Sequence, residues 1–237
     1  MRYYPVFLDL KERLCVVIGG GRVAERKVKS LLRAGARVKV ISPQLTASLA
    51  RLKERKRISH LSRTYRRSDL RGAFLAIGAT DDRSINERIF REAAAGRIPV
   101  NVVDDPAHSS FIVPSIVEKK DLLVAISTSG KSPALARVLR QKLEKEVGPE
   151  YEGFLKLLGR VREKLLPLGL GQPRNQKIFR KLVGEDLLPL IRGKKFRELN
   201  RRLIRVLGPG YSLKDLGLKW GKGRGETDLG EGALKEC

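Results

Sequence analysis

The sequence predicts an α/β fold in which helices cover both faces of a parallel β-sheet. Three observations support this prediction. Short apolar runs alternate with longer amphipathic segments in the first part of the chain. A glycine-rich turn directly follows the first apolar run. The chain has 237 residues, of which 41% are hydrophobic, and this is enough for a packed core in one large or two modest domains.

The glycine turn is the most specific of these features. An apolar strand runs into three glycines from Gly19 to Gly21, and a helix is expected from Ala24 to Ala34. In the pattern Gly19-x-Gly21-x-x-Ala24, the first glycine allows a tight turn, the second lets a phosphate approach, and the alanine keeps the helix close to the strand. Such a turn presents backbone N–H groups to a pyrophosphate. The alternative is a turn that merely joins strand to helix.

The remaining elements follow in the order that a parallel sheet requires. Further strands are expected at Arg37–Ile41, within residues 58–65, at Ala73–Ala79 and at Pro99–Val103. A helix is expected at Arg83–Ala95, with residues 80–82 as its cap and Gly96 at its end. We therefore predict a doubly wound, Rossmann-like nucleotide-binding domain over residues 1–110.

Ligands of such sheets lie beyond the carboxyl ends of the strands. Four expected strand ends meet this description, at residues 19–22, 42–44, 78–81 and 104–106. A dinucleotide site usually has an acidic residue near position 42 to hold a ribose, but Ser42 and Pro43 stand there. The residues alone therefore leave the choice of cofactor open.

A different pattern follows the fifth strand. Two apolar runs, Phe111–Val117 and Leu122–Ser127, predict an antiparallel hairpin. A helix is expected over Pro133–Val147, with Ser132 as its N-cap. The loop before it holds the residues expected to bind an anionic substrate: Ser127, Thr128, Ser129 and Lys131. The alternative is an ordinary N-cap turn.

Charge is the second large signal. The chain has 50 Lys and Arg residues against 26 Asp and Glu, a formal net charge of +24. This excess attracts polyanions, either nucleic acid or a small substrate with many carboxylates, although part of it is explained by solvated surface. Aromatic residues make up only 5% of the chain, and no helix-turn-helix, zinc or RNP-type signature is present. We therefore expect no nucleic-acid partner.

No apolar run is long enough to span a bilayer, and the N-terminus lacks a signal-peptide core. We therefore expect a cytoplasmic protein with no membrane partner. Cys15 lies in the first expected strand and Cys237 is the last residue, so we expect no disulfide. No metal-ligand spacing is present, and no metal site is expected.

Several motifs occur together, in order, over about residues 1–147. They are residues 5–10, 16–27, 79–82 with Asn86, 101–106, 110–115 and 126–137. With these motifs the chain resembles the siroheme synthase N-terminal family. Members of that family are precorrin-2 dehydrogenases, and some are also sirohydrochlorin ferrochelatases.

The resemblance implies that NAD is the cofactor and that precorrin-2, a tetrapyrrole with many carboxylates, is oxidised to sirohydrochlorin in siroheme biosynthesis. It leaves open whether ferrous iron is then inserted. The family tolerates Ser-Pro after the second strand, so Ser42 does not count against NAD. The hairpin and the helix after it correspond to the family's dimerisation region, which implies a homodimer.

The resemblance also implies roles for individual residues. Asp104 matches the family's catalytic aspartate, and Asp105 is the rival. The implied cofactor contacts, together with those of the glycine turn, are Gly19, Gly21, Arg22, Val23, Ala24, Ser42, Pro43, Gln44, Thr80, Asp81, Asn101 and Val102. Thr128 stands where some relatives carry a serine that can be phosphorylated; hydrogen bonding to a substrate carboxylate is the simpler interpretation.

Two histidines are left without a firm role. His108, close to Asp104 in the sequence, is either a group that handles substrate or iron or an ordinary loop residue, whereas His60 is expected at the surface or a sheet edge. After a dimerisation region at 111–147, we expect a helical domain over 148–207 and a flexible or loosely docked tail over 208–237. Two alternatives to the enzyme remain: a non-catalytic tetrapyrrole-binding module and a basic Rossmann-type protein that binds nucleic acid.

Overall fold

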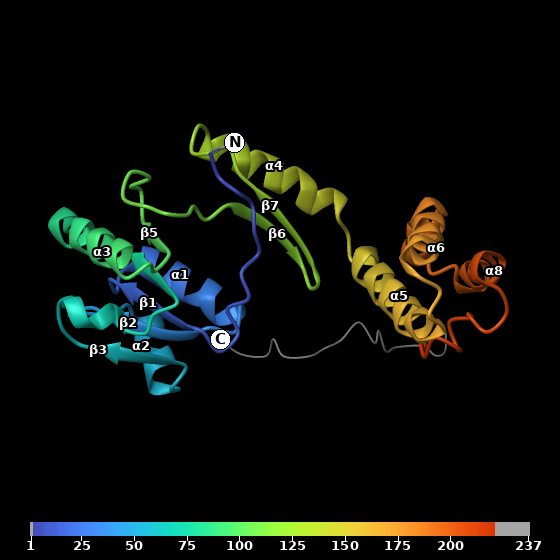
Figure 1. The fold of residues 1–237 in the computed structure, drawn as a ribbon, viewed down its shortest axis with the longest axis horizontal. Coiled ribbons are helices and arrows are strands. Elements are labelled where there is room, and N and C mark those ends of the chain that lie inside the picture. Colours follow the sequence, from blue (N-terminus) through green and yellow to red (C-terminus); the bar gives the residue numbers. More distant parts are fainter. Residues whose placement is uncertain (1, 221–237) are drawn as a thin grey trace. The chain divides into compact units, whose positions relative to one another are not determined.

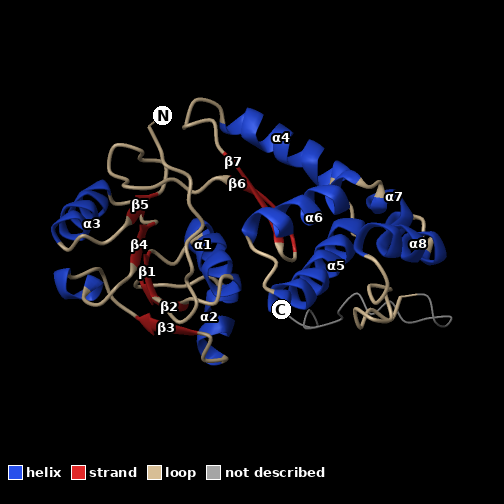
Figure 2. Cartoon of the chain, turned by 45° about the vertical axis from the view of Figure 1, so that its right-hand side comes forward, coloured by secondary structure: helices blue, strands red, loops and turns tan. Residues whose placement is uncertain are grey.

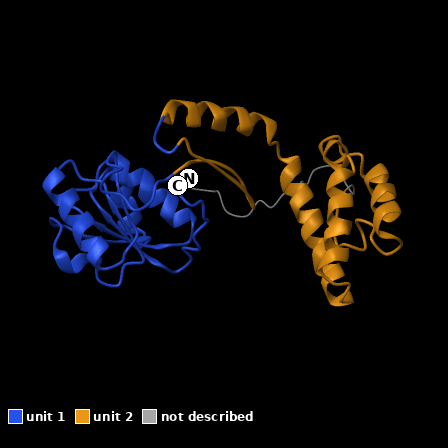
Figure 3. Ribbon diagram, turned by 45° about the horizontal axis from the view of Figure 1, so that its top comes forward, with its two compact units in different colours: residues 1–113, 129–131 blue, residues 114–128, 132–237 orange. Residues whose placement is uncertain are grey.

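The computed structural model describes residues 2–220 of the chain. Two compact units are present, which Figure 3 shows in different colours. Within the described residues, the first contains residues 2–113 and 129–131, and the second contains residues 114–128 and 132–220.

The first unit (Figure 1) is built on a five-stranded sheet, whose strand order β3-β2-β1-β4-β5 can be followed in Figure 2. Its strands are β1 (Leu14–Ile18), β2 (Arg37–Ile41), β3 (Ile58–Leu61), β4 (Leu75–Gly78) and β5 (Val100–Val102). All four neighbouring pairs are parallel. The strand order reverses between β1 and β4. The glycine turn after β1 therefore lies at the position where an open parallel sheet binds its ligands. The predicted fold class is confirmed.

Helices cover both faces of this sheet. They are α1 (Arg22–Arg33), α2 (Ala47–Glu54) and α3 (Arg83–Ala95), with a short 3-10 helix, η1 (Arg67–Leu70). In Figure 2, α1 and α2 lie on one side of the strands and α3 lies on the other. Helix α3 has the predicted bounds, because the Asp82 carboxylate accepts from the backbone N–H groups of Ser84 and Ile85. Helix α1 starts two residues earlier than predicted.

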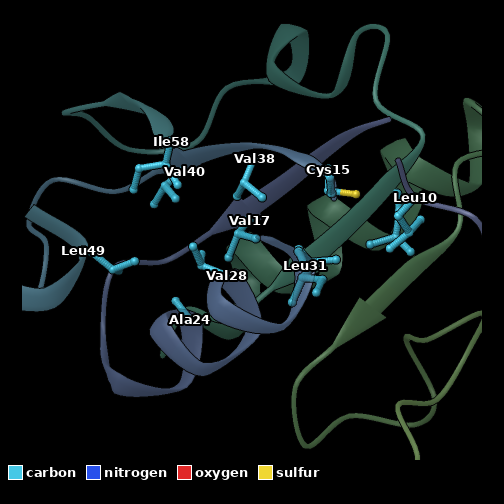
Figure 4. Close-up of a cluster of buried hydrophobic side chains, with 13 residues drawn as sticks. Leu10, Cys15, Val17, Ala24, Val28, Leu31, Val38, Val40, Leu49 and Ile58 are labelled. Atoms are coloured by element: carbon cyan, nitrogen blue, oxygen red, sulfur yellow. The ribbon is translucent and has the colours of Figure 1, made fainter. Parts of the chain in front are cut away.

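Successive residues of the central strands face opposite helices. Val17 and Val40 are fully buried with Val28 of α1 in one cluster, which Figure 4 shows. Val16 is buried in a second cluster with Ile89 of α3. Because both faces are covered, the central strands are continuously apolar instead of alternating.

The second unit begins with an antiparallel hairpin of β6 (Ser115–Lys119) and β7 (Leu122–Ile126), which packs against α4 (Pro133–Glu146). The first expected strand, Phe111–Val117, is wrong in its position. The Phe111 carbonyl accepts a hydrogen bond from the Asn101 side chain at 3.1 Å, and Phe111 packs against the core of the first unit. Pairing therefore starts only after Pro114.

The rest of the second unit is helical. It contains α5 (Glu150–Leu165), the 3-10 helix η2 (Leu166–Leu168), α6 (Gln172–Gly184), α7 (Leu187–Arg192) and α8 (Phe196–Leu207). Leu157, Val161 and Leu199 are fully buried at the centre of this bundle. They come from α5 and α8, which therefore pack against each other through apolar side chains.

The expectation of a loosely docked tail from residue 208 is wrong for residues 208–220. Leu213, Leu216 and Leu218 are each at most 5% exposed and belong to the core of the helical bundle. Trp220 packs against Phe196, with ring centroids 5.9 Å apart. These residues complete the bundle, and the remainder of the expected tail, 221–237, lies outside the described residues. Over residues 2–220, no helix is both long and apolar enough to cross a membrane.

Candidate cofactor-binding site

A side chain would meet different surroundings at each of the three glycines of the turn. Gly19 has φ +120°, and a Cβ there would overlap the backbone oxygen of Ala79. A Cβ on Gly20 would overlap the backbone oxygen of Gln44 and lie 2.6 Å from Ser42 Oγ. A Cβ on Gly21, by contrast, would have no described atom within 4 Å. The fold requires the first two glycines, whereas the third leaves open space.

That open space lies at the N-terminus of α1. Gly21 is the N-cap residue and makes no side-chain cap, so the N–H groups of the first turn are left to an outside acceptor. Ala24 is fully buried, which keeps the helix close to the sheet. A helix N-terminus with free N–H groups beside an open backbone fits the pyrophosphate of a dinucleotide.

A cleft of about 580 Å³ extends from this turn along the ends of β1, β2 and β4. Nine of the twelve predicted cofactor residues line it: Gly19, Gly21, Arg22, Val23, Ser42, Pro43, Gln44, Thr80 and Asp81. The other three, Ala24, Asn101 and Val102, are buried and do not line the cleft. Thr46, Thr64 and Tyr65 line it as well, although no sequence motif pointed to them.

The loop after β2 forms one wall of the cleft. Ser42 is 8% exposed, and its hydroxyl donates to the Gln44 carbonyl at 2.5 Å. The serine that replaces the usual acid therefore stabilises the loop itself. His60 lies on the edge strand β3 as expected, but its ring is half-buried, with Nε2 2.9 Å from the Ser42 carbonyl oxygen.

Tyr65 is 5% exposed, and its hydroxyl donates to a carboxylate oxygen of Glu92 on α3 at 2.5 Å. Burial, followed by this hydrogen bond, raises the pKa of Tyr65 well above its ordinary value. The Tyr65 side chain is therefore protonated at neutral pH and adds no charge to the cleft.

Asp104 lies directly beyond β5, with an exposed side chain and a φ of +59°. Its carboxylate accepts no hydrogen bond from the described residues. Burial lowers the pKa of Lys27 on α1, and the charge of Asp104 opposes that shift. Lys27 is thus a cation within electrostatic reach of Asp104.

Asp105 is instead engaged within its own loop. One carboxylate oxygen accepts from the backbone N–H groups of Ala107 and His108, each at 3.2 Å. The other lies 2.7 Å from His108 Nδ1, and this contact lowers the pKa of Asp105. His108 also packs edge-on against Phe90, with ring centroids 5.3 Å apart. The two adjacent acids therefore differ: one shapes the loop and the other is exposed.

The expected anion loop divides between the two units, with Ser127 and Thr128 in the second and Ser129 and Lys131 in the first. Thr128 Oγ1 accepts from the backbone N–H of Ser132 at 3.1 Å. Ser132 in turn caps α4, as predicted, by accepting from the N–H of Leu135. Within the described range, no group of three or more His, Cys, Asp or Glu residues is placed to hold a metal ion.

The parallel sheet, the glycine turn and the cleft at the strand ends together define a dinucleotide-binding domain of the Rossmann type. Residues 6–115 match the family described as "Putative NAD(P)-binding", and residues 120–146 match the family described as "Sirohaem biosynthesis protein central". These two matches support the resemblance to the siroheme synthase N-terminal family seen in the sequence. A nicotinamide dinucleotide is the class of cofactor that this match supports.

Relatives with curated descriptions show the same resemblance. The chain is 42% identical over 192 residues to a siroheme synthase of Methylobacillus flagellatus, covering 79% of the chain and 41% of that protein. It is 35% identical over 232 residues to one of Nitrosomonas eutropha, covering 97% of the chain and 49% of that protein. The chain thus spans less than half the length of these relatives.

A solved structure has a similar fold. SirC, a precorrin-2 dehydrogenase, superposes with a TM-score of 0.70 at 24% sequence identity, and the match covers 86% of this chain and 98% of SirC. The similarity in fold between this chain and SirC therefore extends beyond the dinucleotide-binding domain.

Proposed function

We propose that this chain is an NAD-dependent dehydrogenase that oxidises precorrin-2 to sirohydrochlorin in siroheme biosynthesis. The observation that carries the proposal is the cleft at the glycine turn, with open space at Gly21 and uncapped N–H groups at the start of α1. The names of its relatives and of the SirC structure support the choice of substrate.

The charge of the chain is consistent with this substrate. Precorrin-2 carries many carboxylates, and a formal net charge of +24 attracts and orients a polyanion. We assign the contacts with substrate carboxylates to the predicted loop residues Ser127, Thr128, Ser129 and Lys131. Thr128 retains acceptor and donor capacity beyond its contact with Ser132, because a hydroxyl has one proton and two lone pairs.

NAD rather than NADP is the proposed cofactor. Among the described residues that line the cleft, Arg22 is the one cation, so a ribose phosphate would find little compensating charge there. The family resemblance also implies NAD. When bound, NAD+ supplies the acceptor for the hydride that leaves the macrocycle.

Asp104 is the proposed catalytic residue. The oxidation removes a hydride and a proton from precorrin-2, so the site needs a base for the proton. The Asp104 carboxylate is exposed beyond β5, whereas the Asp105 carboxylate is held by two backbone N–H groups and His108. Lys27 on α1 lies within electrostatic reach of Asp104.

We also propose that the chain forms a homodimer through the hairpin and α4. Several large apolar side chains of these elements are exposed on the described unit: Ile116, Leu123, Leu135, Val138 and Leu139. Apolar surface on a hairpin edge favours pairing with a second chain.

The test is anaerobic incubation of the purified chain with precorrin-2 and NAD+. We expect NADH absorbance to appear together with sirohydrochlorin, and more slowly with NADP+. Tight binding of the tetrapyrrole without NADH would favour the non-catalytic binding module instead. Ferrous iron is added after oxidation is complete, and the formation of siroheme is then measured to test whether the same chain inserts iron.

A further inference from the structure

We propose that His60 is a positioning residue that sets the affinity for the dinucleotide by holding the loop Ser42–Thr46 against β3. This inference rests on the proposed cofactor site. Pro43, Gln44, Leu45 and Thr46 all line the cleft, so the conformation of this loop determines its shape. His60 itself does not line the cleft and acts only through the loop.

The loop is joined to the glycine turn on one side. The backbone N–H of Thr46 donates to the Gly20 carbonyl at 3.0 Å. The Gln44 carbonyl fills the space where Gly20 lacks a side chain. The loop and the turn therefore fit each other directly, and a displacement of one changes the other.

Strand β3 holds the start of the loop from the opposite side. The backbone N–H of Ser42 donates to the Leu61 carbonyl at 3.2 Å, and Ser62 Oγ donates to the Pro43 carbonyl at 3.3 Å. His60 Nε2 lies 2.9 Å from the Ser42 carbonyl oxygen. Because a carbonyl only accepts, Nε2 carries the proton of this hydrogen bond. His60 thus holds the carbonyl group of Ser42, the residue that stands where a dinucleotide site usually has an acidic residue.

Helix α1 holds the end of the loop. Thr46 Oγ1 donates to a carboxylate oxygen of Glu25 at 2.7 Å and accepts from the N–H of Leu49 at 3.3 Å. Thr46 therefore fixes the end of the loop to α1, and it also caps α2. At its start, the strand pairing and the hydrogen bonds between Ser42 and Gln44 are supplemented by His60 and Ser62, which join the loop to β3 and the residue after it.

A loop that is ordered before binding loses less conformational entropy when the dinucleotide binds. Loss of the His60 hydrogen bond releases the Ser42 carbonyl and lets Pro43 and Gln44 move. A single hydrogen bond contributes about 0.5–1.5 kcal/mol, which corresponds to an affinity change of about 2- to 10-fold.

The experiment compares full-length wild type with His60→Leu, which removes the donor, and with His60→Gln, whose amide retains an N–H donor. Ser59→Ala, at an exposed neighbouring position on β3, is the matched control. Binding of NAD+ alone is measured by calorimetry, and KM for NAD+, kcat and Tm are measured alongside. We expect about 2- to 10-fold weaker binding and a higher KM for His60→Leu with kcat unchanged, and affinity nearer wild type for His60→Gln.

Unchanged NAD+ binding by His60→Leu would overturn the inference. Equal losses of affinity in the Leu and Gln variants, in proportion to a lower Tm, would overturn it too, because they indicate a general structural role. If wild type binds neither NAD+ nor NADP+, the cofactor site itself is wrong and this inference falls with it. If wild type binds NAD+ but does not oxidise precorrin-2, only the proposed reaction fails, and the binding comparison still tests His60.

Discussion

The backbone oxygen of Gln44 occupies the space that a side chain on Gly20 would need. The neighbouring glycine differs, because no described atom lies within 4 Å of a Cβ on Gly21. The turn therefore separates two requirements that the sequence pattern presents together. Gly20 is required by the close approach of the loop after β2, and we propose that Gly21 leaves room for a ligand.

We predict opposite outcomes for Gly20→Ala and Gly21→Ala. Gly20→Ala forces the loop after β2 away and costs about 1–3 kcal/mol of unfolding free energy. Gly21→Ala fits the extended backbone at that position, with φ −82° and ψ −174°, and changes stability by less than about 1 kcal/mol. It should still weaken NAD+ binding by about tenfold or more, because the methyl group fills the phosphate space. Urea unfolding and calorimetry measure both; tight NAD+ binding by Gly21→Ala would contradict the assignment.

Much of the first unit follows from local sequence chemistry. The bounds of α3 follow from the Asp82 cap and Gly96, and the strands follow from apolar runs that two helical layers cover. The glycine turn lines a cleft, and its role in binding a cofactor stays a prediction. The start of β6 did not follow, because Phe111 is drawn into the core of the first unit by contacts distant in sequence.

The residues missed at the site share one property. Thr46, Thr64 and Tyr65 reach the cleft from loops, and two of them, Thr46 and Tyr65, have partners far along the chain. Thr46, for example, hydrogen bonds to Glu25, and Tyr65 to Glu92. Long-range hydrogen bonds have no spacing that a single sequence reveals, so these contacts could be found only in the folded chain.

Glu25 gives a prediction for acid stability. Hydrogen bonds from Lys29 and Thr46 lower the pKa of Glu25 from 4.5 to about 2. Its ionised form therefore stabilises the fold above about pH 4.5, and this contribution is lost as the pH falls toward about 2. Glu25→Gln should lower stability at pH 7 and flatten the acid part of the stability curve. Urea unfolding from pH 7 downward, with exposed Glu54→Gln as the control, measures this; identical curves for Glu25→Gln and wild type would contradict it.

Cys15 should be unreactive in the native protein. It is fully buried in β1, and burial raises the pKa of its thiol to about 11. In a Cys237→Ser variant, we expect no alkylation by iodoacetamide at pH 8 until denaturant is added. Rapid labelling of the native variant would show that β1 opens or that the sheet is packed differently.

Two truncations test the packing after α8. Ending the chain before Gly208 removes Leu213, Leu216 and Leu218 from the core of the helical bundle, and each lost leucine is worth about 2–5 kcal/mol. Ending the chain after Trp220 keeps these contacts. We expect the first truncation to lose the cooperative melting of the second unit and the second truncation to keep it. Similar melting of both would mean that residues 208–220 do not stabilise the bundle.

The central claim is that the chain oxidises precorrin-2 with Asp104 as the proton acceptor. Its most direct test is the anaerobic rate of NADH formation from precorrin-2 and NAD+ for wild type, Asp104→Ala and Asp105→Ala. Loss of general-base catalysis typically costs about 100-fold or more, so we expect that loss for Asp104→Ala with NAD+ binding intact. Asp105→Ala, which loses the contact with His108, should keep most of the rate. Full activity of Asp104→Ala would contradict the account.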